Sequence, residues 1–198
     1  MPVDIQPATD RMAEVIRAVP DDALADPTPC DIDLATLLDH VRTFTAAFTA
    51  AARRDTDPFQ GRPPAPDPAN LGDDWRERLP RALDELAAAW REPAAWTGMT
   101  SAGGLELPGE MAGTIALDEV VVHGWDVARA IGRPYDAEPD LLDEIYGWVA
   151  QFADPGSPLP REGLFGPPVP VPADAPLLDR VLGLTGRDPN WSPASSKR

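Results

Sequence analysis

The stretch "DEVVVHGWDVARAIG", residues 118–132, decides the fold class of this 198-residue chain. It belongs to an apolar segment that we expect to form one long helix from about Glu110 to Ile131. Gly132, followed by Arg133-Pro134, ends this helix, because glycine adopts the left-handed backbone of a helix terminus and proline cannot continue a helix. The segments on either side are therefore expected to supply the helices that pack against it.

Prolines divide the rest of the chain into segments whose apolar residues recur at the 3.6-residue period of an amphipathic helix. No stretch shows clear strand alternation, and the Gly- and Pro-rich residues 92–110 fit either a plain loop or a short β-hairpin. The further helices are expected at residues 7–19, about 33–54 (with Asp31 or Asp33 as N-cap), 73–90 (with Pro80 marking a kink or a later start), 138–152 and 175–184.

This pattern predicts an all-α fold, a four-helix bundle with crossover connections and an extra short C-terminal helix. We expect residues 1–153 to form the helical bundle. Residues 154–198 are expected to supply a proline-rich loop, the short helix and a tail, all packed on the same domain.

The charge and composition exclude several functions. The chain has 17 Lys and Arg against 33 Asp and Glu, a net charge of −16, which disfavours nucleic acid and an anionic membrane surface as partners. No apolar run approaches the roughly 20 residues of a membrane span, and the first residues lack the form of a signal peptide. With a single cysteine there is no internal disulfide, so we expect a soluble cytoplasmic protein. Abundant Ala, Pro and Arg are typical of a GC-rich, for example actinobacterial, genome.

The chain's two histidines, His40 and His123, both lie on strongly apolar helices. Glu119 and His123 are four residues apart and project from the same helix face, with Asp126 one turn further along. His40, at the edge of an apolar stripe, can reach the groove between two packed helices, where bundles build metal sites. Zinc accepts imidazole and carboxylate ligands, and three protein ligands leave one position open. Spacing alone is a weak signal, because a single histidine on an apolar helix is more often a core residue than a ligand, and Glu119 and His123 could form a simple helix pair.

Two of these segments carry a resemblance. "TPCDIDLATLLDHV" (residues 28–41) and residues 118–132 together resemble the DinB-like, mycothiol-dependent maleylpyruvate isomerase N-terminal family. "LLDRVLGLTGRDPNWSP" (residues 177–193) resembles the tail of a compact actinobacterial metal-binding branch. The family usually has Trp where this chain has Ile32. The resemblance implies a four-helix bundle with one divalent metal at His40, Glu119 and His123.

The resemblance also implies the chemistry. The metal is zinc in the isomerase, although nickel and ferrous iron accept the same ligands. Mycothiol, a low-molecular-weight thiol, is the implied cosubstrate, and the implied function is an S-transferase or isomerase acting on a small electrophile. The isomerase has an additional C-terminal domain that we do not expect here. The alternatives are a non-catalytic metal- or small-molecule-binding protein and a metal-dependent hydrolase. The oligomeric state stays open, with a homodimer as one alternative.

Four further residues have assigned roles. Asp126 is expected to orient an imidazole or pair with Arg129, and Arg129 to contact an anionic substrate or form a helix salt bridge. Trp125 is assigned to cofactor binding together with Asp126 and Arg129; the alternative is that it is a core residue. Cys30 precedes a helix start that can lower a thiol pKa, but we interpret it as a small, partly buried residue rather than a fourth ligand or redox thiol.

Overall fold

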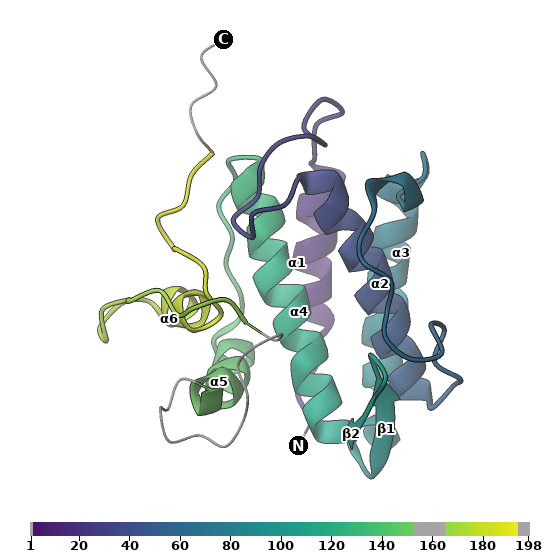
Figure 1. Cartoon of the computed structure of the whole chain (residues 1–198). Coiled ribbons are helices and arrows are strands. Elements are labelled where there is room, and N and C mark those ends of the chain that lie inside the picture. The colour runs from purple at the N-terminus through teal and green to yellow at the C-terminus, as the bar shows by residue number, and fades with distance from the viewer. Residues whose placement is uncertain (1, 153–164, 194–198) are drawn as a thin grey trace.

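The protein is described by a computed structural model that covers residues 2–152 and 165–193 (Figure 1). The α-helices are α1 (Gln6–Arg17), α2 (Leu34–Arg53), α3 (Trp75–Trp90), α4 (Gly109–Ala130), α5 (Pro139–Val149) and α6 (Leu177–Leu184). The remaining elements are the 3-10 helices η1 (Pro68–Asn70), η2 (Pro93–Trp96) and η3 (Ala150–Phe152) and the strands β1 (Met99–Ala102) and β2 (Leu105–Pro108). The predicted all-α, DinB-like bundle with a short hairpin is confirmed.

Helices α1 to α4 form the bundle. Each of α1 and α2 packs against both α3 and α4, so the consecutive helices α1 and α2 lie at opposite corners. In Figure 1, α1 and α4 run in one direction along the bundle and α2 and α3 run in the other. The chain between the parallel helices α2 and α3 must therefore return along the bundle, which is the expected crossover connection. Residues 55–74 make this return.

Local chemistry explains where the site-bearing helices begin and end. Of the two candidate caps for α2, Asp33 is the one used: its side chain accepts the backbone N–H of Thr36 at 2.7 Å. Pro80 lies inside α3, which starts at Trp75, so the alternative of a later helix start is wrong. Gly132 follows α4 with a φ of 68°, the left-handed conformation that ends a helix.

Residues 99–108 form the hairpin rather than a plain loop. β1 and β2 pair antiparallel with Ala102 opposite Leu105. The two residues of the turn, Gly103 and Gly104, have φ values of 61° and 80°, which suit glycine and the twist of a two-residue hairpin. The hairpin packs on α2 and α4, and Thr100 donates to the carbonyl of Ala51 at 2.6 Å. It therefore closes one end of the space between these two helices.

Outside the bundle, α5 packs against α4 and α6. The predicted division at 153/154 falls among residues 153–164, which lie outside the described residues, so that division stays a prediction. Within residues 2–152 and 165–193, no helix is long and apolar enough to cross a membrane.

Candidate metal centre

Both histidines and one glutamate meet between α2 and α4. Nε2 of His40 donates to Oε2 of Glu119 at 3.1 Å, although the two residues are 79 positions apart. Nε2 of His123 lies 3.2 Å from the same oxygen. The two imidazole rings meet edge to face, with centroids 4.8 Å apart. The convergence expected from the sequence is thus present in the fold.

Packing of the two helices explains why these side chains meet. The apolar stripe of α2 includes Leu37, Val41 and Phe44, all buried, and His40 lies at the edge of that stripe. The ring of Phe44 is 5.6 Å from that of His40 and 6.2 Å from that of His123, centroid to centroid. The apolar ring of Phe44 therefore lies beside both imidazoles. Their rotation is restricted, which favours a fixed arrangement of donor atoms.

The charges in the cluster are strongly coupled. Burial opposes ionisation of Glu119, but the hydrogen bonds from His123 and His40 outweigh it and hold the Glu119 pKa well below its usual value. Burial likewise opposes protonation of His123, but its hydrogen bonds, of which that to Asp126 is the largest, raise its pKa well above 6.5. Without a metal, a proton on His123 therefore takes the place of a cation beside the Glu119 carboxylate.

A buried carboxylate on the Nδ1 side of the ring fixes the orientation of His123. Its Nδ1 donates to Oδ2 of Asp126 at 2.9 Å, which turns Nε2 toward Glu119. The same Asp126 oxygen accepts from Nη2 of Arg187 at 3.1 Å. Asp126 is 0% exposed and the Arg187 side chain 13%. Asp126 thus orients an imidazole, as expected from the sequence, but its cationic partner is Arg187 and not Arg129.

The donor set fits a divalent metal. The ligand atoms offered by His40, Glu119 and His123 all lie within 4.8 Å of one another. Two of the separations, 3.1 and 3.2 Å, are close to the roughly 3.4 Å between ligands of a tetrahedral zinc with bonds near 2.0–2.1 Å. A zinc-bound histidine commonly donates its other ring N–H to a carboxylate, as His123 does to Asp126.

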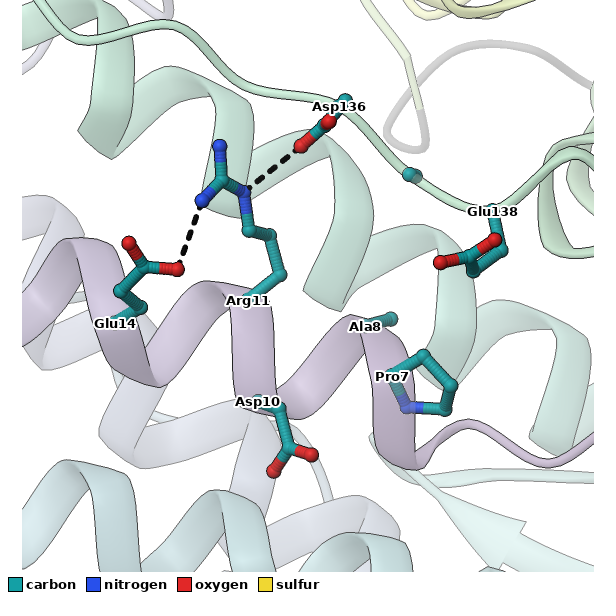
Figure 2. Close-up of a pocket in the computed structure, with 8 residues that line it drawn as sticks. Pro7, Ala8, Asp10, Arg11, Glu14, Asp136 and Glu138 are labelled. Carbon is teal, nitrogen blue, oxygen red and sulfur yellow. Dashed lines mark hydrogen bonds and ion pairs between the residues drawn. The ribbon is translucent and has the colours of Figure 1, made fainter.

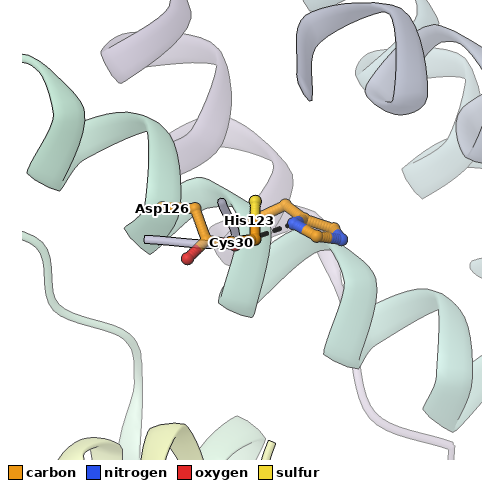
Figure 3. Close-up of side chains that lie close together, drawn as sticks. All are labelled: Cys30, His123 and Asp126. Atoms are coloured by element: carbon orange, nitrogen blue, oxygen red, sulfur yellow. Dashed lines mark hydrogen bonds and ion pairs between the residues drawn. The ribbon is translucent and has the colours of Figure 1, made fainter. Parts of the chain in front are cut away.

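Cys30 belongs to a second group of donor atoms that shares His123 (Figure 3). Its sulfur, the Nδ1 side of His123 and the Asp126 carboxylate lie within 4.8 Å of one another. A cation among them would lie beside the Arg187 guanidinium that already pairs with Asp126, and the two positive charges would repel. Cys30 Sγ also lies 3.2 Å from Oγ1 of Thr28 and is partly buried. The set with His40 is therefore the better candidate.

Two cavities adjoin the cluster. A groove of about 700 Å³ reaches His40 and Glu119 from the side of the hairpin and the segment 62–66. A small cavity of about 60 Å³ reaches Glu119 and His123 from the side of α5 and Arg187. The cluster thus separates a space large enough for an organic molecule from one large enough only for water.

Asp118 lines the small cavity and was not expected from the sequence. It is 6% exposed, and its Oδ1 has no hydrogen-bond partner among the described residues. Burial and the neighbouring Glu119 charge raise its pKa to about 7. A carboxyl group with this pKa can accept or release a proton near neutral pH. Arg187, which lines the same cavity, was also missed, because no local pattern connects it to Asp126.

The structure does not bring Trp125 and Arg129 to the cluster. Trp125 is 4% exposed on α4, and the Arg129 guanidinium lies 5.7 Å from the centre of its ring. Nε of Arg129 donates to the carbonyl of Trp191 at 3.1 Å. Arg129 thus holds the C-terminal segment on α4, whereas Trp125 belongs to the buried core, and their role in cofactor binding stays a prediction.

A separate cavity of about 330 Å³ lies between α1 and residues 136–138 (Figure 2). Arg11 crosses it, with Nη1 2.8 Å from Glu14 and Nε 3.0 Å from Asp136. Its charge is therefore already compensated. The described residues that line this cavity include neither a histidine nor a thiol, so the chemistry is concentrated between α2 and α4.

Comparison with known proteins identifies the family of this chain. The model of the mycothiol maleylpyruvate isomerase N-terminal domain matches residues 5–128, which contain all three candidate ligands. The chain belongs to this family. Two similar relatives are the uncharacterized proteins MT0763 and Rv0738 of Mycobacterium tuberculosis strains CDC 1551 / Oshkosh and ATCC 25618 / H37Rv. Each is 30% identical over 193 residues, covering 92% of this chain and 94% of the relative. No solved structure matches the chain significantly.

Proposed function

We propose that this protein is a metal- and mycothiol-dependent S-transferase or isomerase that acts on a small electrophile in the cytoplasm. His40, Glu119 and His123 hold one divalent ion, with zinc as the favoured metal. The observation that carries the proposal is the convergence of two imidazoles and one carboxylate from facing helices, and two of these three residues, His40 and Glu119, line a groove. Membership of a mycothiol-related family supports the choice of thiol.

Zinc supplies the chemistry of a Lewis acid, which lowers the pKa of a coordinated thiol so that it is present as the thiolate. The chain's own residues make this chemistry specific. Glu119 contributes the one negative charge of the ligand set, and Asp126 holds His123 with Nε2 toward Glu119. Phe44 packs against both imidazoles and restricts them to one geometry.

The proton released by the thiol needs an acceptor. Asp118, which lines the small cavity beside Glu119 and His123 and has an unpartnered Oδ1 among the described residues, is the group we assign to this role. In the transferase reaction the thiolate sulfur forms a bond to the electrophilic carbon, and the leaving group departs with its electron pair. In the isomerase reaction the thiolate adds to a conjugated double bond, the single bond formed rotates, and the thiolate is expelled again.

The test is mycothiol conjugation to a chloro-nitroarene, followed by absorbance, in zinc-loaded protein. Wild type is expected to accelerate the reaction, and Glu119→Gln to abolish the acceleration. Glu110→Gln is the matched control, because Glu110 lies on the same helix but is exposed. It should retain wild-type activity.

Zinc-edge absorption spectroscopy separates the transferase from the alternatives. Sulfur should enter the zinc coordination shell when mycothiol is added. Zinc binding without any reaction of mycothiol would instead indicate a non-catalytic binding protein. Zinc-dependent ester cleavage that needs no thiol would indicate a hydrolase, and either result would contradict the proposal.

A further inference from the structure

The groove that reaches His40 and Glu119 has a composition that the proposed reaction does not explain. Its walls are formed by aromatic and aliphatic side chains of α2, the hairpin and α4: Phe44, Phe48, Leu105, Leu107 and Ile115. The remaining wall is the segment 62–66, in which Pro63, Pro64 and Pro66 add apolar rings. Apart from His40 and Glu119, the lining residues contain one charged side chain, Arg62.

This composition is unusual for a chain with a net charge of −16. Leu105 shows the contrast most clearly. It is 66% exposed, although it lies on the same strand face as Leu107, which packs toward the bundle. Exposing a large aliphatic side chain beside other apolar groups has no benefit for folding, and grouped exposed apolar residues generally mark a binding surface.

The size and the apolar lining of the groove indicate which of the two reactants it can bind. Its volume of about 700 Å³ lies within the range of roughly 300–1,000 Å³ that is typical of small-molecule sites. Mycothiol is rich in hydroxyl and amide groups, which would lose hydrogen bonds to water and find few partners on these walls. The groove is therefore better suited to the electrophile than to the thiol.

We infer that the protein acts on electrophiles with a bulky apolar body, such as an aromatic or polycyclic group, which lies in this groove with its reactive carbon toward His40 and Glu119. The placement of a reactive carbon beside His40 and Glu119 rests on the proposed function. The binding of an apolar group in the groove does not depend on that function. Leu105 and Leu107 form one wall of the site, and the segment 62–66, which lies beside the hairpin turn at Gly103 and Gly104, adds to the lining.

The hairpin offers a matched pair of variants to test the inference. Leu105→Glu places a charge on the groove wall at an exposed position, so the bundle core is untouched. Met99→Glu makes the same change at a residue that is 58% exposed on the other face of the hairpin and does not line the groove. Both variants should take up zinc as wild type does.

Binding is measured with the neutral fluorophore N-phenyl-1-naphthylamine. Wild type should bind it, and Leu105→Glu should bind it about tenfold more weakly, because the apolar contact is lost and a charge is desolvated. Met99→Glu should bind it as wild type does. No binding to wild type, or equal binding to wild type and Leu105→Glu, would overturn the inference.

Turnover is measured with mycothiol and two alkylating agents that share one reactive carbon, chloroacetamide and N-(1-naphthyl)chloroacetamide. In each, sulfur displaces chloride, which leaves with its electron pair. Wild type should prefer the naphthyl compound in kcat/KM, and Leu105→Glu should lose about tenfold of that preference. Turnover without any naphthyl preference overturns the inference and leaves the proposed function standing. Fluorophore binding in the groove without any thiol reaction supports the apolar binding site but overturns the proposed function and, with it, the placement of a reactive carbon beside His40 and Glu119.

Discussion

The substitution Asp126→Asn tests the support behind the candidate metal centre. Asp126 is 0% exposed and lies between two donors, His123 at 2.9 Å and Arg187 at 3.1 Å. Asparagine has nearly the same shape, so the change removes the negative charge and leaves the packing intact. Its amide oxygen can still accept one hydrogen bond, but it cannot compensate the charge of the buried guanidinium.

The expected loss of stability follows from that guanidinium. Removing one partner of a buried ion pair costs about 3–5 kcal/mol, because the other charge is left uncompensated. The Arg187 side chain keeps 13% exposure, so we expect a value near the lower end, about 3 kcal/mol. Loss of a carboxylate behind a metal-bound histidine lowers metal affinity by roughly 10- to 100-fold. Because the amide still orients His123, we expect about tenfold weaker zinc binding.

Both quantities can be measured on one protein preparation. Urea unfolding of the zinc-free protein, followed by tryptophan fluorescence at neutral pH, gives the free energy of unfolding. Competition with a chromophoric chelator gives the zinc affinity. Asp143→Asn, at an exposed position on α5, is the control and should change the free energy of unfolding by less than about 0.5 kcal/mol.

A double variant tests whether the loss of stability comes from the uncompensated charge of Arg187. Asp126→Asn combined with Arg187→Met removes both charges, and the pair should lose less stability than the sum of the two single losses. Unfolding and zinc affinity of Asp126→Asn equal to those of wild type would refute the reasoning. Strictly additive losses would show that the two residues do not act as a pair.

Three further predictions concern the centre and the bundle. Burial opposes protonation of His123, but its hydrogen bond to Asp126 raises its pKa well above 6.5. Zinc must displace that proton, so zinc affinity should rise as the pH is raised through and beyond the ordinary histidine pKa of about 6.5, and calorimetry in different buffers should detect proton release; a pH-independent affinity would contradict this. Cys30→Ser should retain wild-type zinc content by elemental analysis, because Cys30 belongs to the less favourable donor group, and loss of zinc would make Cys30 a ligand. Gly113→Ala should lower the free energy of unfolding by about 1–3 kcal/mol in urea, because its new Cβ would lie 2.5 Å from the Trp96 ring, and an unchanged value would show that the ring moves aside freely.

Much of the bundle could be predicted because its signals are local. Prolines, the Asp33 cap and Gly132 act on their own neighbours, so helix positions follow from short stretches of sequence. The meeting of His40 with Glu119 and His123 was expected mainly from the family resemblance, and the scarcity of histidine added support. Both scarce histidines lie on apolar helices, and in a bundle such helices face one another.

The rest of the site depends on packing between distant segments. Arg187 reaches Asp126 across 61 residues, and no periodicity or spacing indicates that pairing. Asp118 precedes a predicted ligand, yet its raised pKa comes from burial that only the packed structure defines. The groove combines α2, the segment 62–66 and the hairpin, and its shape depends on the path of the crossover connection. These features come from tertiary structure and not from local sequence.

Zinc stoichiometry after equilibrium dialysis tests the central claim most directly. Wild type and the exposed-site control Glu110→Gln should each bind about one zinc per chain, whereas His40→Ala and Glu119→Gln should bind far less. Circular dichroism of each variant confirms that the bundle is intact. Wild type that takes up no zinc from a saturating buffer, or folded His40→Ala that binds as much as wild type, would contradict the claim that these residues form a metal centre.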